Sequence, residues 1–71
     1  MDLEYSNHAI IQKEERFITD IEVIECLDDW DTRHTDKKVN QIFRKVLSSG
    51  RGIKVVVAKN NNRFIITVAD Y

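Results

Sequence analysis

The sequence predicts an α+β fold, with two helices in the first half of the chain and a β-hairpin at its end. Two helix-start signals lie within residues 6–22, a β-branched apolar run fills residues 53–59, and a second such run follows three consecutive asparagines. Helices that precede paired strands are typical of a two-layer arrangement around one core. A chain of 71 residues has room for one such core, so we assign residues 1–71 to a single domain.

The first strand and helix are predicted from alternation and capping chemistry. Met1–Tyr5 can form a short edge strand, because Leu3 and Tyr5 stand two residues apart. Ser6 or Asn7 can then cap a helix by accepting a hydrogen bond from an exposed amide. Four apolar side chains fall near one face of this helix: Ile10, Ile11, Phe17 and Ile18.

A second helix is predicted to start at Thr19. Thr19-Asp20-Ile21-Glu22 forms a capping box, in which the threonine accepts from the third amide and Glu22 reaches back to the Thr19 amide. Apolar residues follow at spacings of three and four, namely Val23, Ile24, Leu27 and Trp30. The tight junction at Ile18–Thr19 therefore predicts a helical elbow.

The segment Asp28–Asp36 (DDWDTRHTD) is predicted to be a loop. It lacks apolar periodicity and is rich in residues that bond to their own backbone. Its four aspartates and one histidine suggest a metal site, but a calcium loop requires a central glycine and a terminal bidentate glutamate, and the segment has neither. We favour a solvated acidic loop that ends the second helix.

The segment Lys37–Ser49 has two interpretations. Its apolar residues fit a helix face, with Thr35 as the cap and Gly50 as the stop: Val39, Ile42, Phe43, Val46 and Leu47. The same residues fit a strand that is buried on both faces, and local periodicity does not separate the two.

The C-terminal hairpin is the clearest β prediction. Ile53–Lys59 and Arg63–Ala69 are the strands, and Asn60-Asn61-Asn62 tolerates the left-handed backbone of a tight turn. The predicted inward set is Ile53, Val55, Val57, Phe64, Ile66 and Val68. The opposite face is mixed, with Lys54, Val56, Arg63, Ile65 and Thr67, and such a face can be covered or can bind a ligand.

Composition narrows the class of protein. The acidic N-terminus without an apolar core does not resemble a signal peptide, and no apolar run approaches the ~18 residues of a membrane span, so we expect a soluble, cytoplasmic protein. Cys26 is the single cysteine, which excludes an intrachain disulfide and the usual zinc spacings. A core this small is often supplemented by a partner chain, and Trp30 is a candidate anchor for the core or for a partner.

The two halves of the chain carry opposite charge. Residues 1–36 hold three basic and eleven acidic side chains, whereas residues 37–71 hold eight basic and one acidic. Such asymmetry points to nucleic acid or to an oppositely charged partner, although the halves can also neutralise each other across the fold.

Several short motifs carry a resemblance to a known family. His8-Ala9, then Arg16 and Ile18, then Val23 resemble the H-A…R-x-I…V start of the family called domain of unknown function 4258. The runs at residues 53–57 and 65–68 resemble its closing hairpin. That family is similar to the RelE/ParE superfamily of small toxins, and the resemblance covers nearly the whole chain.

The resemblance implies an N-terminal strand, two helices on one sheet face, and a three-stranded antiparallel meander that begins with a strand at Gln41–Leu47. Two positions depart from it. Gln12 stands where family members often carry an arginine, and Asp70 places a carboxylate before the final tyrosine. Both departures weaken the grip on phosphate.

The resemblance also implies a function, namely a toxin-like, metal-free endoribonuclease that acts on mRNA. Such an enzyme moves protons and stabilises charge on the phosphoryl oxygens without a cofactor. The implied catalytic residues are His8, Arg44, Arg63 and Tyr71, and the implied RNA-binding residues are Lys45, Arg51 and Lys54. The implied partners are RNA, including ribosome-associated mRNA, and a cognate antitoxin, with a homodimer left open. The alternative is a non-catalytic protein-interaction module of the same fold.

Overall fold

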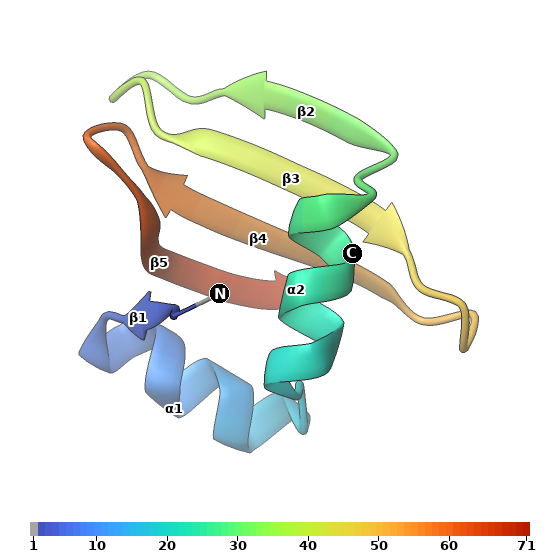
Figure 1. Cartoon of the computed structure of the whole chain (residues 1–71). Coiled ribbons are helices and arrows are strands. Elements are labelled where there is room, and N and C mark those ends of the chain that lie inside the picture. Colours follow the sequence, from blue (N-terminus) through green and yellow to red (C-terminus); the bar gives the residue numbers. More distant parts are fainter. Residues whose placement is uncertain (1) are drawn as a thin grey trace.

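The structure, a computed structural model, describes residues 2–71, so Met1 of the predicted first strand lies outside the described residues. The elements confirm the α+β prediction (Figure 1) and run in the order β1 (Glu4–Tyr5), α1 (Asn7–Arg16), α2 (Asp20–Asp28), β2 (Thr32–Thr35), β3 (Gln41–Val46), β4 (Gly52–Ala58) and β5 (Asn61–Asp70). The strands form one sheet in the order β1-β5-β4-β3-β2. The pairs from β2 to β5 are antiparallel, and β1 lies parallel to β5.

Both helices begin as their caps predict. The Ser6 side chain accepts from the Ala9 amide, and α1 ends at Phe17, whose φ of 54° is left-handed. At the start of α2, Thr19 accepts from the Glu22 amide while the Glu22 carboxylate accepts from the Thr19 amide, which completes the capping box. Local chemistry therefore fixes the elbow at residues 17–19.

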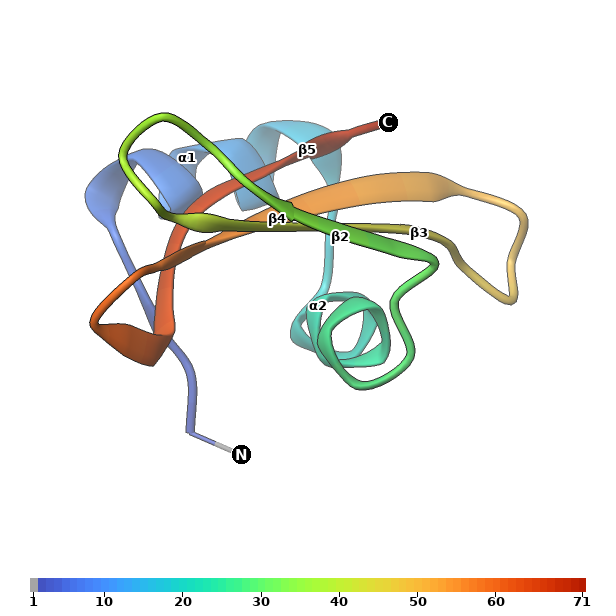
Figure 2. The same ribbon diagram turned by 90° about the horizontal axis from the view of Figure 1, so that it is seen from above.

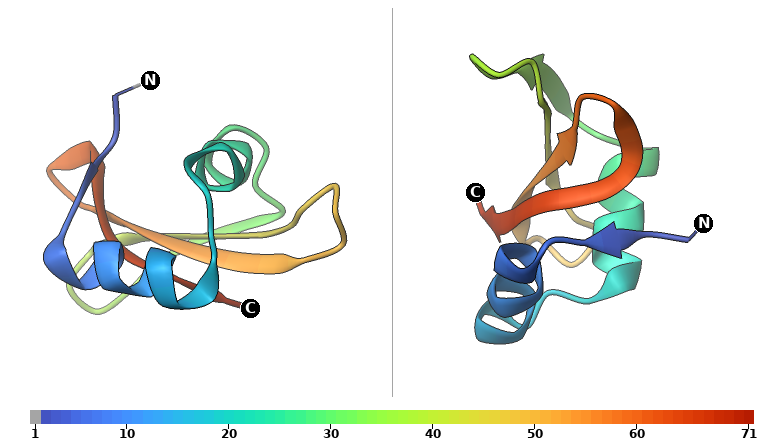
Figure 3. Two further views of the ribbon diagram at one scale, coloured as in Figure 1. Left: turned by 90° about the horizontal axis from the view of Figure 1, so that it is seen from below. Right: turned by 90° about the vertical axis from the view of Figure 1, so that its left-hand side faces the viewer.

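The two helices occupy different places beside the sheet. Helix α2 lies across one face of β3 and β4, whereas α1 runs along β5 at the edge of the sheet (Figures 2 and 3). Two side chains fasten α1 there: Gln12 Oε1 accepts from the Val68 amide, and Ser6 Oγ donates to the Ile66 carbonyl. The other face of the sheet is covered by neither helix.

The structure corrects the predicted loop at residues 28–36 and decides between helix and strand for residues 41–46. Asp28–Asp36 is not a loop throughout, because Thr32–Thr35 forms β2 and adds a fourth antiparallel strand to the predicted meander. All four residues of β2 are exposed, so the strand carries no apolar alternation. The segment 41–46 is the strand β3 and not a helix.

The core lies between α2, the end of α1 and the inner face of β3–β5. Its fully buried side chains are Ala9, Val23, Cys26, Ile53, Val55, Ile65 and Val68. The predicted inward positions Phe64 and Ile66 are only half-buried, and Ile65 takes their place. A bulge explains the shift: Val56 pairs with Thr67 but Val57 pairs with Ile65, so the register slips by one residue at Ile66.

Candidate nucleic-acid interface

The sheet face away from α2 collects cationic side chains from three segments. Residues that pair across antiparallel strands point to the same face, so the partners Arg44 and Lys54 share one face, as do Val56 and Thr67. Phe43 and Val55 pair on the opposite face and belong to the core beneath α2. We call the face that carries Arg44 and Lys54 the open face; from the same pairings it holds Thr32, His34, Ile42, Arg44, Val46, Lys54, Val56, Thr67 and Ala69.

A shallow hollow of about 530 Å³ lies on the open face. Its apolar lining residues are Ile42, Val56 and Ile66, and its charged ones are three lysines, Lys37, Lys38 and Lys54, and one carboxylate, Asp36. An apolar floor with a cationic rim fits a ligand that combines flat apolar groups with negative charge.

The β2–β3 turn holds two of these lysines in place. Oδ1 of Asp36 accepts from the amides of Lys38 and Asn40, at 2.8 and 2.9 Å. Partial burial raises the pKa of Asp36, but these amides outweigh it and hold the pKa below its ordinary value. Val39 in the same turn has a φ of 66°, which is an outlier for a β-branched residue. The turn is therefore held in a conformation that its own sequence disfavours.

Arg44 and Tyr71 meet on the open face. The Arg44 guanidinium lies 5.3 Å from the centre of the Tyr71 ring, within cation–π range. The Nε atom of Arg44 is buried and finds no hydrogen-bond partner within residues 2–71. Gly52 makes this arrangement possible, because a Cβ atom there would lie 2.7 Å from the Tyr71 carbonyl oxygen and 3.3 Å from its ring. An arginine beside an exposed aromatic ring can bind a phosphate or a carboxylate.

Lys45, an RNA-binding residue implied by the family resemblance, lies on the α2 side of the sheet and not on the open face. It pairs with Ile53 on the side of α2 and is 9% exposed. Its Nζ atom lies 3.1 Å from Asp29 and 3.8 Å from Asp31, and the hydrogen bond to Asp29 raises the pKa of Lys45 above its ordinary value. The structure thus does not bring Lys45 together with Arg44 and Lys54.

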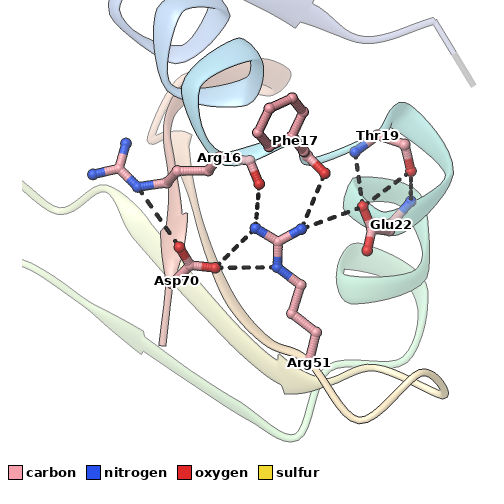
Figure 4. Close-up of polar contacts among 6 residues, drawn as sticks. All are labelled: Arg16, Phe17, Thr19, Glu22, Arg51 and Asp70. Carbon is pink, nitrogen blue, oxygen red and sulfur yellow. Dashed lines mark hydrogen bonds and ion pairs between the residues drawn. The ribbon is translucent and has the colours of Figure 1, made fainter.

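Arg51, the second proposed RNA contact, fastens four parts of the chain together (Figure 4). Its guanidinium donates to Asp70 at 2.9 and 3.1 Å, to the Phe17 carbonyl at 3.0 Å and to the Arg16 carbonyl. Glu22 lies 3.9 Å away and adds a longer ion pair. Asp70, which the sequence marks as a repulsive charge beside phosphate, is thus paired with Arg51 and sits on the core side of β5 opposite Ile53.

His8 and Arg63 lie apart from Arg44 and Tyr71. His8 is exposed in the first turn of α1, next to Ser6, whose backbone and side chain bond to Ile65 and Ile66. Arg63 is exposed near the β4–β5 turn, between Asn61, which pairs with Ala58, and Ile65, which pairs with Val57. Ala58 lies four residues along β4 from Lys54, or about 13 Å at strand spacing. Of the four proposed catalytic residues, the structure brings together Arg44 and Tyr71.

Sequence reasoning missed three side chains of this surface. Lys37 and Lys38 were read as part of an ambiguous segment, and His34 was read as part of an acidic loop. His34 pairs with Ile42 and therefore stands one diagonal step from Arg44 on the open face. The available signal was the threonine-rich, β-branched composition of residues 32–35, which fits an exposed edge strand.

The aspartates of the Asp28–Asp36 segment serve structural roles. Asp29 and Asp31 pair with Lys45, Asp31 accepts from the Val46 amide, and Asp36 caps its own turn. Among residues 2–71, no group of three or more histidine, cysteine, aspartate or glutamate side chains is placed to hold a metal ion. Neither helix in this part of the chain has the length and apolar character that a bilayer crossing needs.

Comparison with known proteins gives a family and nothing further. No curated protein and no solved structure matches the chain. One family model, that of a domain of unknown function (DUF4258), matches residues 5–70, a range that runs from β1 to the last residue of β5. The match thus includes Tyr5 of β1 and the whole of every later element, and the chain belongs to the DUF4258 family.

Proposed function

We propose that this domain binds RNA across its open face and acts as a toxin-like endoribonuclease of the RelE/ParE type that requires no metal. The observation that carries the proposal is the convergence of Arg44, Lys54, Lys37 and Lys38 on one face. Phosphate contacts from lysine and arginine supply most of the affinity for nucleic acid.

The apolar floor of the hollow supports a single strand as the ligand. Bases of single-stranded RNA stack on exposed aromatic rings, and Tyr71 presents such a ring at 60% exposure. Ile42 and Val56 offer apolar surface between the cations of the rim. A base can therefore lie on the floor while its phosphates contact the lysines.

The cleavage step assigns distinct roles to the side chains of the open face. The ribose 2′-oxygen attacks the adjacent phosphorus, the bond from phosphorus to the 5′-oxygen breaks, and the products are a 2′,3′-cyclic phosphate and a 5′-hydroxyl. Arg44 stabilises the charge on the phosphoryl oxygens. His34 accepts the 2′-hydroxyl proton, and Tyr71 donates a proton to the departing 5′-oxygen. In this proposal His34 takes the part that the family resemblance implies for His8.

A non-catalytic module of the same fold is the second candidate. The elbow between the helices exposes two large apolar side chains, Phe17 at 85% and Ile21 at 77%. Exposed apolar groups of this size are typical of protein-binding surfaces. The separation of His8 and Arg63 from Arg44 also favours a module over an enzyme.

Incubation of the purified domain with labelled RNA in the presence of a chelator tests the proposal. We expect cleavage to 2′,3′-cyclic phosphate ends, with the rate reduced at least tenfold in Arg44→Ala and in Tyr71→Phe. The charge-matched control is Arg33→Ala, because Arg33 lies on the other face, and it should cleave at the rate of the unsubstituted protein.

Two other outcomes redirect the assignment. Binding that depends on Arg44 and Lys54 without cleavage, alone or with ribosomes, leaves an RNA-binding domain and removes the nuclease. No RNA binding at all favours the module. Expression in cells gives an independent check, since a toxin arrests growth and Arg44→Ala relieves the arrest, whereas a module is harmless in both forms.

A further inference from the structure

The sheet ends at β5 with its short partner β1 on one side and at β2 on the other, and only the β5 side is covered by other parts of the chain. At the β5 edge, β1 pairs with Phe64 and Ile65, and α1 covers the next residues through Ser6 and Gln12. An unpaired strand edge invites another strand, and proteins commonly cover such edges. The β5 edge is covered in this way.

The β2 edge is left open. Asp36 donates its amide to the Asn40 carbonyl, which marks these two residues as a hydrogen-bonded pair of the β2–β3 ladder. Because such pairs alternate along antiparallel strands, the backbone groups of Arg33 and Thr35 point away from β3. Within residues 2–71 the sheet order ends at β2, so no strand takes these groups up (Figure 1).

A hollow of about 370 Å³ lies beside this edge, on the side of α2. Its walls include Leu27, Phe43, Trp30 and Arg33. Trp30 is 42% exposed, stacks at an angle on Phe43 and carries the Arg33 guanidinium 5.2 Å from its ring. A half-exposed tryptophan and an arginine beside an unfilled hollow are the residue types that dominate binding energy at protein interfaces.

The charged residues at the β2 edge indicate what kind of partner binds there. Arg33 and His34 lie in β2, and Lys37 and Lys38 follow it. The acidic residues that flank the strand are already engaged: Asp31 contacts Lys45 and the Val46 amide, and Asp36 caps the turn. Arg33, Lys37 and Lys38 form no ion pair within residues 2–71, so the edge presents three unpaired cations together with unused backbone donors and acceptors.

We propose that an extended, acidic segment of a partner protein pairs with β2 as a sixth strand and places an apolar side chain in the hollow beside Trp30. Strand addition of this kind takes its affinity from main-chain hydrogen bonds and its specificity from pockets for alternate side chains. The surface lies at the edge of the sheet and does not depend on RNA binding by the open face.

A second copy of the chain fits this edge less well. In an antiparallel β2–β2 pair, the symmetric register centred on Arg33 places the two guanidinium groups directly opposite each other, and like charges directly opposite are destabilising. An edge of four residues also falls short of the roughly 800 Å² per partner that a stable interface buries. A flexible segment avoids both problems because it can follow the edge and fill the hollow.

Titration of the ¹⁵N-labelled domain with a ten-residue peptide that alternates glutamate and valine tests the proposal. We expect the Arg33 and Thr35 amides to shift and to become protected from hydrogen exchange. A peptide with lysine in place of glutamate should bind at least tenfold more weakly. Thr35→Pro should weaken the acidic peptide at least tenfold, because proline removes an outward N–H and leaves the β2–β3 ladder intact. Replacement of both Lys37 and Lys38 by glutamate should reduce the preference for the acidic peptide, because these lysines lie on the open-face side, toward which the glutamates point when the valines face the hollow.

Three results would overturn this assignment. The first is shifts confined to Lys37, Lys38, Arg44 and Lys54, which would show simple charge attraction on the open face. The second is a concentration-dependent dimer in sedimentation equilibrium that Arg33→Glu abolishes. The third is binding without exchange protection of the Arg33 and Thr35 amides, which decides the question even where Thr35→Pro fails to fold. Arg44→Ala should leave peptide binding unchanged. Failure of the RNA proposal can therefore be told apart from failure of the peptide proposal.

Discussion

At the scale of single residues, the charged side chains divide into those that hold the fold and those that remain available. Arg51 and Lys45 contact acidic groups of the chain itself, whereas Arg44 and Lys54 lie on the open face. Residue type alone does not separate them, because the distinction depends on which face of a strand each occupies. The sequence motifs therefore identified candidates, and the strand pairing decided among them.

Arg51 should contribute strongly to stability. It joins the β3–β4 loop to Asp70 and to the carbonyls of Arg16 and Phe17. We expect Arg51→Ala to lower the free energy of unfolding by about 2 kcal/mol, since hydrogen bonds to charged groups each carry roughly that much. Arg51→Lys should recover little, because a lysine cannot reproduce the planar fork. Urea denaturation measures both.

The control for this prediction is Arg63→Ala, which removes an exposed arginine near the β4–β5 turn and should change stability by less than about 0.5 kcal/mol. An Arg51→Ala variant as stable as that control would show that the network in Figure 4 has no energetic weight.

Asp20 should make stability depend on pH. The hydrogen bond from Lys13, followed by that from the Tyr5 hydroxyl, lowers the pKa of Asp20 below its ordinary value of 3.8. A carboxyl group with a lowered pKa in the folded state stabilises the fold above its unfolded pKa, and this contribution is lost as the pH falls through the folded pKa. Asp20→Asn should therefore be less stable than the unsubstituted protein at pH 6, and the gap should close below pH ~3.5.

Thermal denaturation of the two proteins between pH 2.5 and pH 7 tests this expectation. Asp2→Asn is a matched control, since Asp2 is an exposed carboxylate before β1. A gap between Asp20→Asn and the unsubstituted protein that stays constant across this range would contradict the role of Asp20.

At the scale of elements, the sequence predicted correctly those features that depend on neighbouring residues, such as the helix starts. Both helix starts followed from side chains within three residues of the cap. Strand β2 was missed because a strand exposed on both faces has no apolar alternation, and its existence depends on β3 as a partner. The inward set of β5 was misassigned because the bulge at Ile66 moves Ile65 into the core, and strict alternation does not encode a bulge.

Gln12 illustrates an element held by one side chain. The residue is 8% exposed, and its Oε1 atom lies 3.0 Å from the Val68 amide. We expect Gln12→Leu to lower the free energy of unfolding by roughly 1–3 kcal/mol, because it leaves a buried amide without a partner. Hydrogen exchange should show the Val68 amide exchanging faster, with amides of β3 unchanged.

Gln12→Glu is the informative companion, since a carboxylate can still accept from Val68. If Gln12→Leu leaves the exchange of Val68 unchanged, α1 is held by its apolar contacts and not by this bond.

At the scale of the whole molecule, the opposite charges of the two halves only partly cancel. The Arg51 and Lys45 contacts join the basic half to acidic residues of the helices and the Asp28–Asp36 segment. Arg44, Lys54, Lys37 and Lys38 remain outside these pairs. Neutralisation across the fold therefore holds for Arg51 and Lys45, whereas binding of nucleic acid or of a charged partner by the remaining cations stays a prediction.

The four cations outside these ion pairs, Arg44, Lys54, Lys37 and Lys38, set the salt dependence of RNA binding. Four cations in contact with the phosphates of a single strand predict a slope of about −3 for log K against log salt concentration. Lys54→Ala should reduce the magnitude of the slope by about 0.7, whereas Lys59→Ala, an exposed lysine in the β4–β5 turn, should not change it. Fluorescence anisotropy at several salt concentrations measures the slope. A slope near zero would show that these cations do not contact the phosphates.

The position of β5 has a consequence for the order in which the protein acquires structure during synthesis. The strand that α1 packs against, and the aspartate that Arg51 needs, are synthesised after all the other elements of this domain. Helix α1 is synthesised before β5, so the face of α1 that carries Ala9 stays uncovered until residues 61–70 emerge. A nascent chain paused before residue 61 should thus expose apolar side chains to chaperones, and release should begin only when the last strand is complete.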